Sequence, residues 1–230
     1  MRQVVVLCGG AGTRLRTVVG DRQKCLVDVA GRPFLRHVLD TVARWRVDEV
    51  LLLTGHGAEQ VIEYVGTLTP PYRIRCRTEA SPLGTIGALR GARDELAEES
   101  LLVLGDVLPP MDARLWNRLA ASAVRTGAAG VMATGDAHES LDQGNVMAEG
   151  DLVARYDKAA VGPLIDRGTR YLRHVALDRF PGDSDQKFFG AMVAAGALAH
   201  LRVPGPVLDV GTPERLARVR AAIATSGHRA

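Results

Sequence analysis

The apolar residues of this chain follow two spacings, short runs of strand length and longer stretches with helical periodicity. The strand-length runs lie at Gln3–Cys8 and at residues 48–55, 72–78 and 100–106. The helical stretches follow Pro33 as far as Trp45 and recur over residues 58–65, 85–97 and 212–224. Strands that alternate with helices predict an α/β sheet with helices on both faces. Active sites in such sheets lie beyond the carboxyl ends of the strands.

The segment from about Gly135 to Gly190 has a different pattern, because it is polar and poorly periodic. We interpret it as strands and loops inserted around a site. Asp106 and Asp209 each follow an apolar stretch that we expect to be a strand. The sequence shows no internal repeat or low-complexity tract, so we expect one domain over residues 1–230.

Composition narrows the classes of function. Hydrophobic residues make up 47% of the chain and charged residues 24%, as in ordinary globular proteins. No apolar run reaches the roughly 18 residues of a membrane span. The net charge is +3, but basic and acidic residues are interleaved and aromatics are only 4%, which argues against nucleic-acid binding. We expect a small anionic substrate instead.

The three cysteines show neither disulfide nor zinc spacing. They predict reduced thiols and a cytoplasmic protein without a membrane partner. The sequence leaves homo-oligomerisation open.

Val4–Arg16 ("VVVLCGGAGTRLR") joins an apolar strand to a glycine loop, a pattern typical of phosphate binding. It does not fit the dinucleotide motif, because Leu15 fills the position of the last small residue and no acid follows the second strand. It does not fit the P-loop either, because Thr13-Arg14 stands where Lys-Ser/Thr is needed. A plain turn would not explain the "QKCLVDVAGRP" that follows.

The chain resembles the nucleoside triphosphate:sugar-1-phosphate nucleotidyltransferases, and is most similar to the short branch that activates heptose 1-phosphates, with mannose-1-phosphate guanylyltransferases nearby. The matching motifs are Gly9–Leu15, Gln23-Lys24, Gly31–Pro33, Glu79–Ala88, Leu104–Asp106, Gly144–Val146, Asp157-Lys158 and Leu208–Leu216. The resemblance implies a three-layer Rossmann-like fold with a mixed, mostly parallel sheet. It also implies a nucleoside triphosphate and a sugar 1-phosphate as substrates.

The resemblance assigns roles to residues of this chain. It implies catalytic roles at the leaving pyrophosphate for Arg14 and Lys24, and a Mg²⁺ site at Asp106 and Asp209. It implies nucleotide binding by Leu7, Gly9, Gly10, Ala11, Gly12, Thr13, Glu79, Pro82, Gly84 and Thr85. Sugar-phosphate binding falls to Asp106, Gly144, Asn145, Asp157, Lys158, Gly168 and Gln186. Two carboxylates suit Mg²⁺, although either alone fits a turn-capping Asp about equally well.

Some residues depart from the family pattern. Gln23 replaces the usual proline and leaves its loop without a fixed φ. Gln186 and the "IDRGTR" segment alter the expected sugar pocket, which favours an unusual sugar. Glu79 can accept from the paired donors of guanine, so GTP is the expected nucleotide and ATP the alternative. A solvated loop acid explains Glu79 nearly as well. The sequence also leaves open a hexose 1-phosphate and a non-catalytic nucleotide-binding protein.

Overall fold

The structure is a computed structural model that describes residues 1–10, 12–15, 20–141 and 143–226. Its strands are β1 (Gln3–Cys8), β2 (Asp28–Val29), β3 (Arg32–Pro33), β4 (Glu49–Thr54), β5 (Arg73–Thr78), β6 (Glu99–Leu104), β7 (Gly130–Asp136), β8 (Val146–Glu149), β9 (Leu152–Tyr156), β10 (Leu164–Arg173) and β11 (Leu198–Arg202). Its α-helices are α2 (Phe34–Ala43), α3 (Ala58–Gly66), α4 (Gly84–Gly91), α5 (Leu115–Thr126), α6 (Val175–Arg179), α7 (Asp185–Ala194) and α8 (Pro213–Ser226). None of these helices is long and apolar enough to cross a lipid bilayer.

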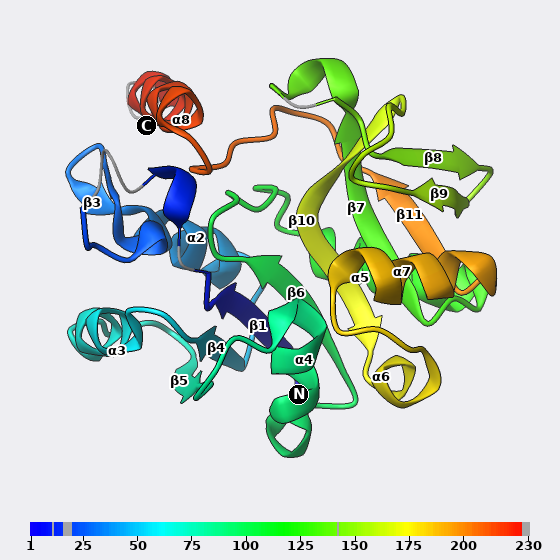
Figure 1. Cartoon of the computed structure of the whole chain (residues 1–230), viewed down its shortest axis with the longest axis horizontal. Coiled ribbons are helices and arrows are strands. Elements are labelled where there is room, and N and C mark those ends of the chain that lie inside the picture. The colour runs from blue at the N-terminus through cyan, green and yellow to red at the C-terminus, as the bar shows by residue number, and fades with distance from the viewer. Residues whose placement is uncertain (11, 16–19, 142, 227–230) are drawn as a thin grey trace.

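Nine strands form one sheet in the order β5-β4-β1-β6-β10-β7-β11-β9-β8 (Figure 1). The first four run parallel to one another, so their carboxyl ends share one edge. Beyond them β10 is antiparallel to both β6 and β7, and β8 and β9 form an antiparallel hairpin. The sheet is therefore parallel in its first half and mixed in its second, which confirms the expected α/β fold with a mixed sheet.

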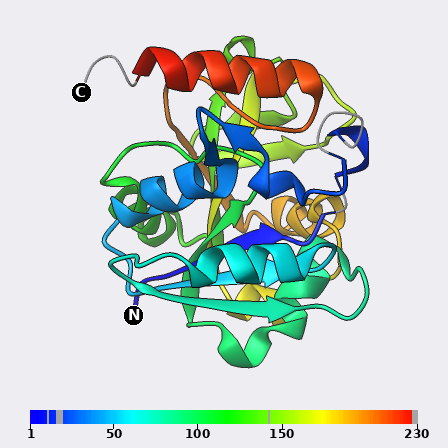
Figure 2. The same cartoon turned by 90° about the vertical axis from the view of Figure 1, so that its left-hand side faces the viewer.

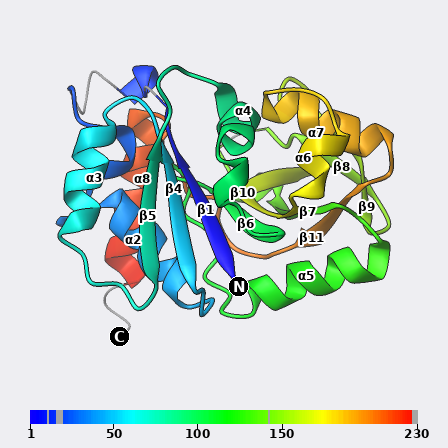
Figure 3. The same ribbon diagram turned by 90° about the horizontal axis from the view of Figure 1, so that it is seen from below.

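Helices cover both faces of the sheet (Figures 2 and 3). Alternate residues of β1 enter different cores, since Val4 and Val6 pack into one and Val5 into the other. The first core takes apolar residues from α2, α3, α5 and α8, and the second takes them from α4, α6 and α7. Burial of both faces explains why β1, β4 and β6 are nearly continuous apolar runs.

The elements predicted from apolar spacing are present, with two differences. The helix expected over residues 85–97 ends at Gly91, and a 3₁₀ turn at Arg93–Glu95 follows. The strand expected before Asp209 was wrong, because that segment makes only an isolated bridge from Asp209 to Val107. Pro204 and Pro206 precede it, and a proline has no N–H to donate to a strand ladder.

Candidate active site

Two cavities lie side by side at the carboxyl edge of the parallel strands. The first cavity, of about 470 Å³, is lined largely by the loops that follow β1, β4, β5 and β6. The second cavity, of about 540 Å³, is lined by β10 and by loops around Asp106, Lys158 and Asp209. Lys24, Leu104 and Asp106 line both cavities. These three residues therefore form a junction at which ligands of the two cavities would meet.

The first cavity brings together most of the residues predicted to bind nucleotide. They are Leu7, Gly9, Gly10, Gly12, Glu79, Pro82, Gly84 and Thr85. Ala11 lies outside the described residues, and so does the side chain of Thr13. Gly12 has a φ of +60°, and a β-carbon there would lie 3.1 Å from Cβ of Lys24. Glycine thus allows the loop to pass close beside Lys24.

Gln23 is almost fully buried, and its side chain holds the glycine loop through hydrogen bonds. Its Nε2 donates to the carbonyl of Cys8 at 2.7 Å and to that of Gly10 at 3.4 Å. Its Oε1 accepts from the backbone N–H of Cys25 at 2.6 Å. Its φ of −61° is the value that a proline would impose. Without the proline, this loop was expected to lack a fixed φ. Gln23 nevertheless has a proline-like φ, and the hydrogen bonds of its side chain hold the loop in place.

Glu79 enters the first cavity from the end of β5. Its Oε1 packs so closely on the chain that a β-carbon on Gly9 would lie 3.0 Å away and one on Gly55 2.8 Å away. Its Oε2 accepts from the backbone N–H of Leu83 at 3.3 Å. Among the residues that the structure describes, Glu79 has no ion-pair partner. An unpaired carboxylate in a cavity of this kind can accept from donors on a ligand.

Two cation–carboxylate pairs line the second cavity near the junction. Lys24 Nζ donates to Oδ2 of Asp106 at 2.5 Å, and Arg215 Nη1 contacts both oxygens of Asp209 at 3.2 and 3.3 Å. Asp106 follows β6, and Asp209 is brought beside it by the bridge to Val107. The backbone N–H of Val210 donates to the carbonyl of Asp106 at 2.9 Å, which fixes the two segments together.

Of the other predicted residues, some line the second cavity and some do not. Arg14, Asn145 and Lys158 line it, and Arg14 is exposed. Four further residues are absent from its described lining: Gly144, Asp157, Gly168 and Gln186. Each of the four has a contact elsewhere in the chain.

The contacts of these four residues are structural. Gly144 packs against Gly162, whose oxygen would lie 1.9 Å from a β-carbon at position 144. Asp157 accepts from the N–H of Ala159 at 2.9 Å and from Arg155 at 3.1 Å, and these bonds hold the pKa of its carboxyl below the usual value. Gly168 forms the bulge of β10. Gln186 accepts from the backbone N–H of Lys158 at 2.9 Å.

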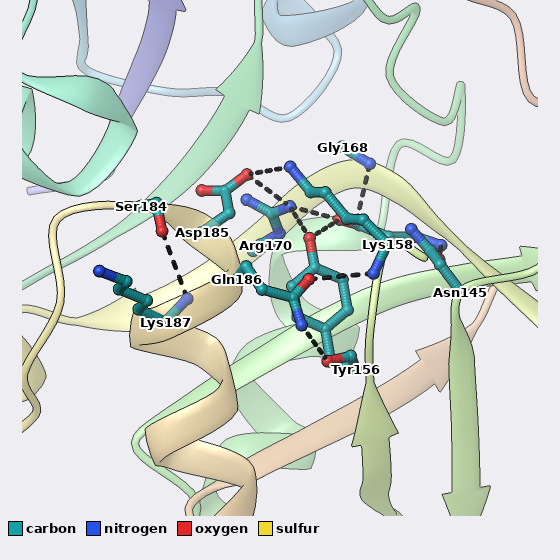
Figure 4. Close-up of polar contacts among 10 residues, drawn as sticks. Asn145, Tyr156, Lys158, Gly168, Arg170, Ser184, Asp185, Gln186 and Lys187 are labelled. Atoms are coloured by element: carbon teal, nitrogen blue, oxygen red, sulfur yellow. Dashed lines mark hydrogen bonds and ion pairs between the residues drawn. The ribbon is translucent and has the colours of Figure 1, made fainter. Parts of the chain in front are cut away.

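A buried ionic cluster of Asp166, Arg170 and Asp185 underlies the second cavity (Figure 4). Arg170 bonds to Asp166 and lies 3.3 Å from Oδ2 of Asp185. Lys158 Nζ reaches that same Oδ2 at 3.3 Å, and Figure 4 shows its side chain extending over the cluster. Tyr156 donates from its hydroxyl to Asp166 at 3.4 Å. The guanidinium of Arg170 also lies 4.5 Å from the centre of the Phe189 ring.

Burial and charge oppose one another in this cluster. Burial disfavours ionised Asp185, but Arg170 and Lys158 outweigh it and hold the pKa of Asp185 below the usual value. Burial also disfavours charged Arg170, and the two carboxylates more than compensate, so its pKa is raised. Arg170 and Asp185 therefore each stabilise the charged form of the other.

Residues 4–157 match the family described as MobA-like NTP transferase domain, and this match covers more than half of the chain. The chain belongs to the MobA-like NTP transferase domain family. This result confirms the resemblance drawn from the glycine loop and the motifs that follow it.

Relatives of this NTP transferase domain include sugar-1-phosphate guanylyltransferases. It is 31% identical to a probable mannose-1-phosphate guanylyltransferase 2 of Arabidopsis thaliana, over 92% of this chain and 62% of that protein. It is 33% identical to a D-glycero-alpha-D-manno-heptose 1-phosphate guanylyltransferase of Aneurinibacillus thermoaerophilus, over 49% of each chain. The chain thus spans less than two thirds of the length of these relatives.

Solved structures support the fold of the NTP transferase domain. HddC from Yersinia pseudotuberculosis complexed with GMP-PN superposes with a TM-score of 0.78 at 24% identity, over 97% of this chain and 100% of that one. A putative glucose-1-phosphate thymidylyltransferase from Bacillus anthracis superposes with a TM-score of 0.79 at 16% identity. At these identities the likeness concerns the fold alone.

The carboxylates of this NTP transferase domain fit the magnesium ion that the resemblance implies. Asp106 and Asp209 both line the second cavity, where Lys24 and Arg215 contact them. Among the described residues there is no group of three or more acidic, histidine or cysteine side chains that could hold a metal. Mg²⁺ needs only one or two carboxylates when phosphate oxygens and waters complete its shell.

Sequence reasoning did not single out Asp166, Arg170 or Arg215. Arg170 lies in β10, whose sequence LIDRGTRYLR mixes charged and apolar residues, so its burial to 1% side-chain exposure leaves no clear signal in the pattern. A buried arginine requires carboxylate partners, and one of them, Asp185, lies 15 residues further along the chain. Arg215 stands within the matched "LDVGTPERL" motif, six residues after Asp209.

Proposed function

We propose that this protein transfers a nucleotidyl group from a nucleoside triphosphate to a sugar 1-phosphate, forming an NDP-sugar and pyrophosphate. The observation that carries the proposal is the junction of the two cavities at Lys24 and Asp106. The nucleotide occupies the first cavity and the sugar phosphate the second, so the reacting groups meet where positive charge and carboxylate are held 2.5 Å apart.

The reaction needs alignment and charge neutralisation more than it needs an activated nucleophile. An oxygen of the sugar phosphate forms a bond to the α-phosphorus, and the bond from that phosphorus to the oxygen bridging to the β-phosphate breaks. Pyrophosphate leaves with the electron pair. The attacking oxygen is already anionic, so no general base is required. When bound at Asp106 and Asp209, Mg²⁺ supplies positive charge to the phosphate oxygens.

The cations of the site divide between the two substrates. Lys24 lies at the junction and Arg14 lines the second cavity beside it, so both can meet the charge that grows on pyrophosphate as it leaves. Lys158 lines the second cavity but not the first, and it binds the phosphate of the sugar. Asp185 holds its ammonium in place from below.

We further propose GTP as the nucleotide and D-glycero-D-manno-heptose 1-phosphate as the sugar phosphate. Glu79 presents acceptors only, and guanine offers paired donors at N1 and N2, whereas adenine offers an acceptor beside its amino group. The relatives named above are guanylyltransferases for mannose and heptose 1-phosphates. Mannose 1-phosphate is therefore the second sugar to test, and ATP is the second nucleotide.

The test is a pyrophosphate-release screen of four nucleoside triphosphates against both anomers of hexose and heptose 1-phosphates, with Mg²⁺. We expect release only when both substrates are present, and fastest with GTP and a heptose 1-phosphate. The control is Arg118→Ala, which removes a cation far from both cavities and should leave the rate unchanged. A folded protein that binds GTP in a thermal-shift assay but releases no pyrophosphate with any pair would be a non-catalytic nucleotide-binding protein.

A further inference from the structure

Arg215 has a contact that the proposed reaction does not yet explain. It lies in the first turn of α8 and lines the second cavity together with Arg14, Lys24 and Lys158. Its side chain is 19% exposed, and its guanidinium contacts Asp209, one of the two carboxylates that suit Mg²⁺. A divalent metal on Asp209 would be repelled by the charge of Arg215, so the two cations oppose one another at this carboxylate. Arg215 is therefore placed to affect both metal binding at Asp209 and phosphate binding in the second cavity.

The contact between Arg215 and Asp209 is weak enough for another partner to replace it. A single nitrogen, Nη1, is shared between both carboxylate oxygens at 3.2 and 3.3 Å. This is a weaker arrangement than the two parallel short bonds of a bidentate arginine–carboxylate pair. The shorter contact of Asp209 is with the backbone N–H of Gly211 at 2.7 Å, and this contact keeps the carboxylate in place without Arg215.

Gly211 makes the close approach possible. A β-carbon at this position would lie 2.7 Å from Oδ1 of Asp209, 3.4 Å from Nη1 of Arg215 and 3.8 Å from Nζ of Lys24. The two cations thus approach Asp209 from the same small region of the second cavity. A phosphate that entered this region would meet both of them.

We propose that Arg215 competes with a divalent cation for Asp209 and, once displaced, binds the phosphate groups of the substrates. This inference rests on the proposed function and assigns a further residue to that site. The planar guanidinium suits phosphate oxygens at least as well as a carboxylate. Before substrate binds, Arg215 balances the charge of Asp209, so the site does not hold an unpaired carboxylate.

The first experiment measures metal binding alone, by the electron paramagnetic resonance signal of Mn²⁺ without nucleotide or sugar. Removing the competing cation in Arg215→Gln should tighten Mn²⁺ binding roughly two- to fivefold, the range expected for the loss of a weak ion pair. Asp209→Asn measures the Mn²⁺ binding at other sites of the protein. The tighter Mn²⁺ binding should disappear in the Arg215→Gln/Asp209→Asn double variant. Unchanged or weaker Mn²⁺ binding in Arg215→Gln would overturn the proposal.

The second experiment measures phosphate binding by calorimetry in saturating Mg²⁺. Arg215→Gln should weaken the binding of inorganic pyrophosphate, of mannose 1-phosphate, or of both by roughly tenfold or more. Loss with pyrophosphate alone assigns Arg215 to the nucleotide, and loss with mannose 1-phosphate alone assigns it to the sugar phosphate. If neither affinity falls, Arg215 is only a counterion of Asp209 and the proposal is wrong.

A matched variant controls for charge. Arg220→Gln removes a positive charge from the same helix, but Arg220 is exposed and donates only to the carbonyl of Asp28 among the residues described. It should change neither affinity. If Arg215→Gln does not fold, Arg215→Lys keeps the charge without the planar fork and should fall between the wild type and the expected values. None of these measurements needs turnover, so a failed pyrophosphate-release screen would overturn the proposed function separately.

Discussion

The two cavities are built by different means, although they share Lys24 and Asp106. The first is lined by several glycines and mostly uncharged residues, on loops that follow four parallel strands. The second is lined largely by charged residues of an antiparallel strand and the segments around it. Glycine loops can bring backbone N–H groups to the phosphates common to all nucleotides, whereas a set of charged side chains can differ between sugars.

The difference extends to how each cavity is held in shape. The glycine loop of the first cavity is held by neutral hydrogen bonds from Gln23. The floor of the second depends on the ionic cluster of Asp166, Arg170 and Asp185, whose members are almost fully buried. Breaking one ion pair of such a cluster leaves an uncompensated buried charge. The second cavity is therefore the part of the site whose stability is most sensitive to single substitutions.

Removal of Arg170 should have the largest effect. Arg170→Met leaves the buried Asp166 without an ion-pair partner and Asp185 with Lys158 alone, and it should lower the free energy of unfolding by about 3–5 kcal/mol, as measured in urea. The partly exposed pair of Arg118 and Asp112 is the control, and Arg118→Met should cost no more than about 1 kcal/mol. Replacing Asp166, Arg170 and Asp185 together by apolar residues should restore much of the loss. A loss below 1 kcal/mol in Arg170→Met would mean that the cluster is not held by charge.

Loss of either carboxylate of the expected magnesium site, Asp106 or Asp209, should come next. Asp106→Asn and Asp209→Asn should each lower kcat/KM roughly 10²- to 10³-fold, because both serve one centre of positive charge at the phosphates. The double variant should be little worse than either single one, since residues that act as a unit are not additive. Both variants should keep the wild-type midpoint of unfolding, which separates this effect from that of Arg170. Near wild-type turnover in either variant would place the metal elsewhere.

The next prediction concerns His174, which joins β6, in the parallel half of the sheet, to the segment before α6. It precedes α6, is fully buried, and bonds to Ser100 on β6 at 2.9 Å and to the carbonyl of Ala97 at 2.5 Å. Burial lowers its pKa to about 4. As pH falls from 6.5 towards 4, the unfolded chain takes up a proton that the folded chain does not, so the fold should lose roughly 3 kcal/mol.

The pH dependence can be isolated by substitution. The free energy of unfolding of the wild type minus that of His174→Asn should fall across this window and level off below pH 4. The exposed His138 is the control, and His138→Asn should leave the slope unchanged. A difference that does not vary with pH would show that the pKa of His174 is the same in the folded and the unfolded chain, and would contradict this account.

Glu79 should have the smallest effect. Glu79→Gln should reduce the preference for GTP over ATP by a few-fold to roughly a hundredfold, the range of about 1–3 kcal/mol for one base contact. The competing substrates are measured side by side with one sugar phosphate. A wild type that prefers ATP, or a variant with unchanged selectivity, would contradict the role of Glu79 and leave the transferase reaction standing.

The difference between the two cavities also explains which parts of the site could be predicted from the sequence. The first cavity follows from local pattern, because an apolar strand, a glycine loop and a lysine lie within Gln3–Lys24. The second does not, because Arg170 lies in a strand, Asp185 begins a helix, and only the packing of α7 on the sheet brings them together. Asp209 lines the same cavity as Asp106, but it does not follow the strand predicted before it, since Pro204 and Pro206 prevent a strand there. The roles of the individual site residues stay predictions.

The central claim is that nucleotide and sugar phosphate occupy separate cavities, and calorimetric binding to two variants tests it most directly. Gly10 lines the first cavity, and a β-carbon there would meet no atom of the described residues within 4 Å, so Gly10→Val adds bulk to the cavity lining without a clash at its β-carbon. Gly66 is equally open but lies at the end of α3, away from both cavities, and Gly66→Val is its control.

Gly10→Val should abolish GTP binding and leave mannose 1-phosphate affinity unchanged. Lys158→Ala should weaken mannose 1-phosphate binding roughly tenfold or more and leave GTP affinity unchanged. Loss of both affinities in either variant, or loss of GTP binding in Lys158→Ala alone, would contradict the two-cavity account.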